Sequence, residues 1–183
     1  MTAEAAVGAP ALPESVRARI VAEFPKYPEK RAVLLSALHF VQEECEGWIR
    51  PEMVPEIAVL LEIREIEVWE VISFYSMFHS ERVGRCHVKV CVNLSCCLRG
   101  ARGMMRRLEE LLDIRPGEVT EDGLFSLEGA ECLGSCGTAP VIQVNNEAYL
   151  ENVRLEELPA MLDRLRGRFS TSAGGAAGNG AAA

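Results

Sequence analysis

Long apolar runs and an excess of positive charge are both missing from this 183-residue sequence, and each absence excludes a class of protein. No window approaches the roughly 20 consecutive apolar residues that a membrane-spanning helix needs, so we expect no direct membrane insertion. The net charge is −8, with 19 Lys and Arg against 27 Asp and Glu. Nucleic acids and anionic membranes attract clustered positive charge, so we expect neither as a partner.

Secretory signals and nucleotide-binding motifs are missing as well. The opening M-T-A-E-A-A-V-G-A-P has neither a basic segment nor an apolar one, so we expect a cytoplasmic chain. No P-loop occurs, and no G-x-G-x-x-G follows an expected strand, so we expect no NADH or flavin site in this chain itself. The three histidines, His39, His79 and His87, are dispersed and suggest no catalytic group.

Seven cysteines are what this sequence does have. In a cytoplasmic chain they favour metal or redox chemistry over structural disulfides. Cys91 and Cys96 form a C-x4-C pair in V-C-V-N-L-S-C-C, and Cys132 and Cys136 form a C-x3-C pair in E-C-L-G-S-C-G. Glycines in such loops let backbone N–H groups approach inorganic atoms closely. The two pairs together predict a bound iron–sulfur cluster or metal.

The other cysteines are weaker candidates. Cys97 adjoins Cys96, but Cys96 is nearer the end of the expected strand and Cys97 is expected to begin a helix, so we favour Cys96. Cys86 lies five residues before Cys91, which is roughly 16 Å along an extended strand and on the opposite face. Cys45 lies on the apolar face of an expected helix. We therefore interpret Cys86 and Cys45 as small buried side chains.

Two alternatives to a cluster stay open at this level. Zinc bound by four thiolates would make the chain a zinc-stapled interaction module, although zinc sites more often show C-x2-C spacing. A redox dithiol of thioredoxin type needs C-x-x-C near a helix N-terminus, and the sequence has none. A visible absorption band would distinguish a cluster from zinc.

The chain changes character near residue 85. Residues 1–13 are rich in Ala and Pro and are expected to be flexible. A small helical bundle is expected over 14–80, because apolar residues recur there at helical spacing. Its helices are predicted at about 14–24, 29–46, 51–61 and 65–74.

Residues 85–168 predict a compact α/β unit with the order β-α-β-β-β-α. Strands are expected at 87–92, 124–131, 141–144 and 147–150, with a turn at 93–96, a helix from about Cys97 to Pro116 and a last helix at 155–166. Both cysteine pairs follow a strand, so we expect their loops at one end of the sheet, where α/β sheets usually carry their sites. A Gly/Ala-rich flexible tail is expected over 169–183.

Residues from both halves resemble the E-subunit family of NADH:quinone oxidoreductase, respiratory complex I. The resemblance covers about residues 14–167. It is carried by Gly47-Trp48-Ile49, Phe74-Tyr75-Ser76-Met77-Phe78, Val90-Cys91, Cys96, Leu98-Arg99-Gly100, the run from Glu131 to Cys136, and Ala139-Pro140-Val141. The resemblance implies an α+β chain, in which the helical bundle precedes a thioredoxin-like domain that carries a [2Fe–2S] cluster.

The resemblance also implies roles for individual residues. Cys91 and Cys96 would hold one iron, and Cys132 and Cys136 the other, and no residue would be catalytic. Pro140 resembles the proline of thioredoxin folds that often follows a cis peptide bond.

The implied function is single-electron transfer within an oxidoreductase. The cluster would accept electrons from the flavin of an NADH-binding partner subunit, on which the helical part would help to dock, alongside further iron–sulfur subunits. The implied location is the peripheral arm of an inner-membrane complex, on its cytoplasmic side. Equivalent subunits serve NAD-linked hydrogenases and formate dehydrogenases, and the sequence does not separate these contexts.

Overall fold

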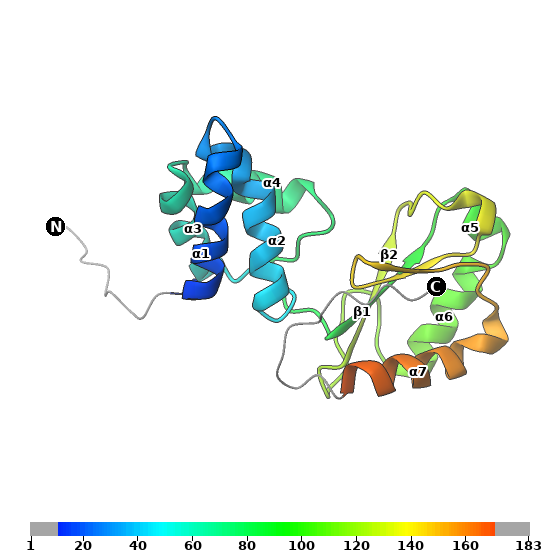
Figure 1. The fold of residues 1–183 in the computed structure, drawn as a ribbon. Coiled ribbons are helices and arrows are strands. Elements are labelled where there is room, and N and C mark those ends of the chain that lie inside the picture. The colour runs from blue at the N-terminus through cyan, green and yellow to red at the C-terminus, as the bar shows by residue number, and fades with distance from the viewer. Residues whose placement is uncertain (1–10, 171–183) are drawn as a thin grey trace. The chain divides into compact units, whose positions relative to one another are not determined.

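The computed structural model describes residues 11–170, which divide between Arg82 and Val83 into two compact units (Figure 1). Each unit has its own hydrophobic core. The fold class is α+β, as predicted, because a helical unit precedes a unit that combines helices with a four-stranded sheet. No helix within the described part of the chain is long and apolar enough to cross a membrane.

The expected flexible ends differ in part from the structure. Residues 1–10 and 171–183 lie outside the described residues. Leu12, however, is only 1% exposed and belongs to the core of the first unit. The last helix continues to Ser170, with Phe169 packed against the core of the second unit. Apolar contacts therefore order both segments beyond the limits that composition suggested.

The first unit contains helices and 3₁₀ turns, and no strand occurs in it between residues 11 and 82. Its elements are α1 (Glu14–Glu23), η1 (Phe24–Lys26), η2 (Lys30–Val33), α2 (Leu34–Glu44), η3 (Pro51–Met53), α3 (Val54–Leu61) and α4 (Glu65–Phe74). The helices expected at 29–46 and 51–61 each begin as a separate 3₁₀ turn. Pro55 accounts for the second case, because a proline is tolerated only in the first turn of an α-helix.

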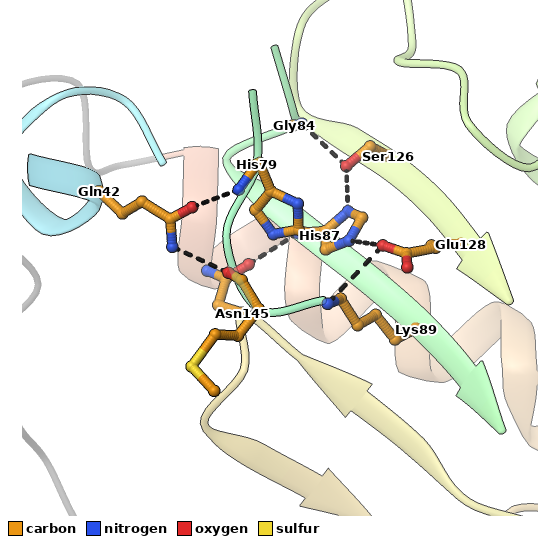
Figure 2. Close-up of polar contacts among 9 residues, drawn as sticks. Gln42, His79, Gly84, His87, Lys89, Ser126, Glu128 and Asn145 are labelled. Atoms are coloured by element: carbon orange, nitrogen blue, oxygen red, sulfur yellow. Dashed lines mark hydrogen bonds and ion pairs between the residues drawn. The ribbon is translucent and has the colours of Figure 1, made fainter. Parts of the chain in front are cut away.

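Gln42 on α2 fastens the segment that follows α4. Its side-chain amide donates to the Met77 carbonyl (2.9 Å), and its side-chain oxygen accepts the backbone N–H of His79 (2.6 Å; Figure 2). The His79 carbonyl in turn accepts the N–H of Ile49 (2.8 Å). These bonds hold the segment in place, and Phe78 within it is buried in the helical core.

The second unit follows the predicted order of strands and helices. Its elements are β1 (Cys86–Cys91), α5 (Leu94–Leu98), α6 (Ala101–Leu112), β2 (Phe125–Ala130), η4 (Cys136–Thr138), β3 (Ile142–Val144), β4 (Ala148–Leu150), η5 (Leu155–Glu157) and α7 (Leu158–Ser170). The sheet has the strand order β2-β1-β3-β4. Strand β2 runs parallel to β1, whereas β3 pairs antiparallel with both β1 and β4.

The two faces of this sheet differ in chemistry. Side chains alternate along a strand, so Val88 and Val90 of β1 share the apolar face. A Cβ atom at Gly129, the register partner of Val90, would touch Met105 of α6, which places α6 over that face. Helices α6 and α7 lie together beside the sheet (Figure 1), and both contribute to one core. His87 and Lys89 belong to the opposite, polar face.

The segment after β1 is helical where a turn was expected. Helix α5 begins at Leu94, whose N–H donates to the side-chain oxygen of Asn93 (2.8 Å). Asparagine is a favoured N-cap because its side-chain oxygen accepts N–H groups at the start of a helix. This cap lets a helix begin at Leu94, although five residues are too few to show an apolar helical pattern in the sequence. Gly100 then takes a φ of 98°, which lets the chain turn from α5 into α6.

Candidate metal centre

Both cysteine loops begin at the same edge of the sheet. Strands β1 and β2 are parallel, and Cys91 is the register partner of Ala130. The first loop leaves β1 at Cys91, and the second leaves β2 at Ala130, one residue before Glu131-Cys132. Parallel strands end at a common edge, so the predicted meeting of the two loops is confirmed.

The first cysteine pair is built into the core. Cys91 is 4% exposed and Cys96 is 2% exposed. Cys91 ends β1, and Cys96 lies in α5, so a strand and a capped helix together set the separation of the two thiols. The two side chains are hydrogen-bonded to each other. This half of the site is therefore formed by regular structure.

Hydrogen bonds favour thiolate chemistry at Cys91. Burial is the largest influence and raises the pKa of this thiol, but backbone N–H groups of Asn93 and Leu133 and the Cys96 thiol together lower the pKa below its ordinary value. Burial, followed by the bond to Cys91, raises the pKa of Cys96 to about 11. Because metals bind the thiolate form, one member of this pair is prepared to ionise before the other.

The second pair lies on a surface loop. Cys132 and Cys136 are both exposed. The N–H of Gly134 points at the Cys132 sulfur (3.4 Å), and Gly134 has a φ of 75°, a left-handed conformation that glycine adopts without strain. Cys136 opens the 3₁₀ turn η4. The glycine expected to bring backbone N–H groups towards the site does so here.

Direct bonds join the two loops. The side-chain amide of Asn93 donates to the carbonyl of Glu131 (2.8 Å), while the N–H of Leu133 donates to the Cys91 sulfur. The charge of Cys136 also influences the titration of Cys96. These contacts bring the loop that carries Cys132 and Cys136 against the Cys91–Cys96 pair.

The cysteine sulfurs are not gathered as tightly as the four ligands of a single zinc ion would be. A tetrahedral zinc with four thiolates holds its sulfurs roughly 3.8 Å apart, given Zn–S bonds of about 2.3 Å. Among residues 11–170, no three cysteine sulfurs lie within 4.8 Å of one another. A binuclear cluster needs four cysteine ligands, and the C-x4-C and C-x3-C motifs supply that number.

The remaining cysteines have other surroundings. The Cys97 thiol donates to the Val92 carbonyl (3.0 Å), which is a bond within its own loop. Cys86 is fully buried in the core of the second unit, and burial raises the pKa of its thiol to about 12. Cys45 is buried in the core of the helical unit, and burial raises its pKa as well. Both fit the small buried side chains that the sequence suggested.

A polar network on the face of the sheet that points away from α6 was not anticipated from the sequence. His87 contacts the Ser126 hydroxyl through Nδ1 (2.6 Å) and the Glu128 carboxylate through Nε2 (2.7 Å; Figure 2). Lys89 lies 3.7 Å from the same carboxylate, and burial lowers the pKa of Lys89. The signal was the alternation of His87 and Lys89 with apolar residues along β1. These bonds join β1 to β2.

Most of the amino-acid sequence matches the model of a known protein family. Residues 20–166 match the family model described as thioredoxin-like [2Fe-2S] ferredoxin. The chain belongs to this family. Its fold class and its [2Fe–2S] cofactor are those that the sequence predicted. The Ala139–Pro140 peptide bond is cis, as the thioredoxin-like resemblance implied.

Members of the family that resemble the chain belong to NADH-quinone oxidoreductases. The chain is 52% identical over 145 residues to NADH-quinone oxidoreductase subunit 2 of Thermus thermophilus, covering 78% of this chain and 80% of that protein. It is 38% identical over 152 residues to an NADH-quinone oxidoreductase E-subunit of Rhizobium meliloti, covering 83% and 89%. The corresponding E-subunit of Aquifex aeolicus is 36% identical over 148 residues, covering 80% and 92%.

A solved structure shares the fold. An NAD⁺-reducing [NiFe]-hydrogenase in its air-oxidised state superposes with a TM-score of 0.64 at 18% identity. The match covers 74% of this chain and 23% of the hydrogenase chain. At this identity the likeness concerns the fold alone.

Proposed function

We propose that the chain is the [2Fe–2S] subunit of an NADH:quinone oxidoreductase and transfers single electrons within that complex. The observation that carries this proposal is the meeting of two cysteine loops at one sheet edge, in a chain whose relatives are NADH-quinone oxidoreductase subunits. The bound cluster supplies the one-electron chemistry. The residues of the chain hold it, shield it and set its environment.

The proposed ligands are Cys91 and Cys96 for one iron and Cys132 and Cys136 for the other. The contact between Cys91 and Cys96 supports the first pair. The bond of the Cys97 thiol to a carbonyl supports Cys96 over its neighbour. We propose that the buried first pair keeps water away from its side of the cluster. The exposed second pair leaves the other side open to a partner subunit.

The proposed electron donor is the flavin of an NADH-binding partner subunit, and further iron–sulfur subunits complete the complex. Exposed apolar side chains support docking to such partners. Leu94 and Leu98 on α5 are 70% and 79% exposed, and Phe74 at the end of α4 is 80% exposed. Leu94 and Leu98 lie one helical turn apart on α5, so these two exposed side chains share one face of that helix. We place the chain in the peripheral arm, on the cytoplasmic side of the membrane.

A cofactor assay tests the cluster. Protein purified without oxygen should contain about two irons and about two acid-labile sulfides per chain, and an EPR signal should appear only after reduction with dithionite. Colourless protein with about one zinc per chain would contradict the proposal and favour the zinc-stapled module.

A partner assay tests the context. The native complex isolated through a tag on this chain should contain a flavoprotein, and NADH should then reduce the cluster that this chain holds. An equivalent role in an NAD-linked hydrogenase or formate dehydrogenase is the second candidate, favoured only by the shared fold with the hydrogenase. Co-isolation of a nickel–iron or formate-oxidising subunit, in place of quinone-reducing activity, would favour that candidate.

A further inference from the structure

Glu151 is an acidic residue outside the cysteine motifs that contacts the exposed cysteine loop. It follows β4, and its Oε1 accepts hydrogen bonds from the Ser135 hydroxyl and from the Thr138 hydroxyl (2.7 Å). The two hydroxyl oxygens also lie 2.6 Å from each other. Two hydroxyl protons are thus shared among three mutual contacts, and the carboxylate oxygen is the one member of the group that can only accept.

These contacts surround Cys136. Ser135 precedes it directly, and Thr138 closes the η4 turn that Cys136 opens. The backbone beside Glu151 continues the attachment, since the N–H of Asn152 donates to the Thr138 carbonyl (2.7 Å). The segment after β4 thus runs along the loop and binds it through side chains and backbone.

The part of the exposed loop around Cys136 has little packing of its own. Cys132 and Cys136 are on the surface, and a Cβ atom at Gly134 or Gly137 would meet no atom within 4 Å. Leu133, next to Cys132, packs against the core that holds Cys91 and Cys96. The end of the loop that carries Cys136 is held instead by hydrogen bonds, and Glu151 makes the charge-assisted ones, which are the stronger kind.

Glu151 carries its negative charge at neutral pH. The hydrogen bond from Ser135, and then the one from Thr138, lowers the pKa of this carboxyl. A cluster bound by four thiolates is itself negative, and reduction adds one more negative charge. A fixed carboxylate near the loop disfavours that addition through like-charge repulsion.

We propose that Glu151 is a positioning residue for the exposed half of the cluster site. It holds the Ser135–Thr138 turn so that the Cys136 sulfur keeps its direction, and its charge lowers the midpoint potential of the cluster. This inference rests on the proposed function. It assigns to one residue two effects that different substitutions separate.

Three variants separate the geometric effect from the charge. Glu151→Ala removes both the acceptor and the charge. Glu151→Gln removes the charge and keeps an oxygen that accepts a hydrogen bond. The double variant Ser135→Ala with Thr138→Val removes both donors and keeps the charge. Glu147→Gln is the matched control, because Glu147 is an exposed acidic residue of the same β3–β4 hairpin and lies outside the hydrogen bonds described for the loop.

The measurements are cluster release into an iron chelator, the midpoint potential, and alkylation of Cys136 in the cluster-free protein. We expect Glu151→Ala and the double variant to release the cluster about tenfold faster than wild type. Both should also change the alkylation rate of Cys136. Glu151→Ala and Glu151→Gln should raise the midpoint potential, the double variant should leave it near the wild-type value, and Glu147→Gln should match wild type in all three measurements.

Three results overturn the inference in distinguishable ways. A wild-type protein without iron and sulfide contradicts the proposed function and this inference with it. A wild-type protein that carries the cluster, with Glu151→Ala equal to it in release, potential and Cys136 alkylation, contradicts the inference alone. A raised potential in Glu147→Gln equal to that in Glu151→Gln would also contradict it, since any surface charge would then suffice.

Discussion

The two cysteine loops that we propose as the cluster site lie in different surroundings. Cys91 and Cys96 are almost fully buried, at 4% and 2% exposure, and they belong to a strand and a capped helix. Cys132 and Cys136 are exposed and belong to a loop with a single 3₁₀ turn. One half of the site is part of the core, and the other half lies on the surface.

This difference separates the stability of the fold from the retention of the cofactor. Changes in the buried half disturb close-packed neighbours, so they should lower the free energy of unfolding even without the cluster. Changes in the exposed half remove hydrogen bonds at the surface, so they should act mainly on cluster binding. The following predictions test this contrast, beginning with the largest effect.

Ligand substitutions should give the largest effect and should distinguish the halves. Cys96→Ser and Cys136→Ser should each abolish the normal [2Fe–2S] signal. In the cluster-free protein, Cys96→Ser should also lower the free energy of unfolding by about 1–3 kcal/mol, because it buries a new hydroxyl. Cys136→Ser should leave that quantity near the wild-type value. EPR and urea unfolding measure the two effects.

Cys97→Ser is the control for this pair, since the hydroxyl can still donate to the Val92 carbonyl. Its EPR signal should equal that of wild type. A lost signal in Cys97→Ser with a normal one in Cys96→Ser would reverse the assignment of the ligand.

Asn93 links the two halves, and its substitution should affect both. Asn93→Ala removes the cap of α5 and the bond to the Glu131 carbonyl, so it should lower the free energy of unfolding by about 1 kcal/mol and speed cluster release. Asn93→Asp keeps the cap, loses the amide donor and adds a negative charge beside the Glu131 carbonyl. It should therefore unfold like wild type and still release the cluster faster. Equal release rates in all three proteins would show that the loops are independent.

Gly134 should show a smaller effect, confined to the exposed half. Gly134→Ala forces a side chain into a left-handed conformation at a cost of about 1 kcal/mol. We expect faster cluster release with unchanged unfolding of the cluster-free protein. Gly137→Ala is the matched control, because Gly137 lies in the same loop with room for a Cβ and without a positive φ. If both variants behave alike, backbone strain does not govern the loop.

The smallest effect at neutral pH concerns Cys86, which opens the strand of the buried half. Its pKa of about 12 exceeds the ordinary 9.0, so the unfolded chain ionises first as the pH rises above 9. The folded state should then lose stability between pH 9 and 12, by up to about 1.4 kcal/mol per pH unit. Cys86→Ala should remove this slope. Urea unfolding of cluster-free protein at pH 8 and 10.5 measures it, and equal slopes in both proteins would contradict the prediction.

Much of the fold and of the candidate site could be predicted from local patterns in the sequence. The alternating residues of β1 and the helical spacing in α2 and α6 predicted those elements, and the C-x4-C and C-x3-C spacings pointed to the four cysteines. Helix α5 was missed because five residues are too few to display a period. Glu151 was missed because it lies 13 residues beyond Thr138 along the chain, and only the β3–β4 hairpin brings it back to the loop.

The sequence by itself determined the chemistry of the site and the order of the elements, because thiol spacing and apolar periodicity are local properties of a chain. Only the tertiary structure decided which cysteines are buried and which are exposed. That distinction arises where parallel strands end beside a common core, which covers Cys91 and Cys96 and leaves Cys132 and Cys136 at the surface. Burial and surface anchoring are non-local, so they follow from packing and not from spacing.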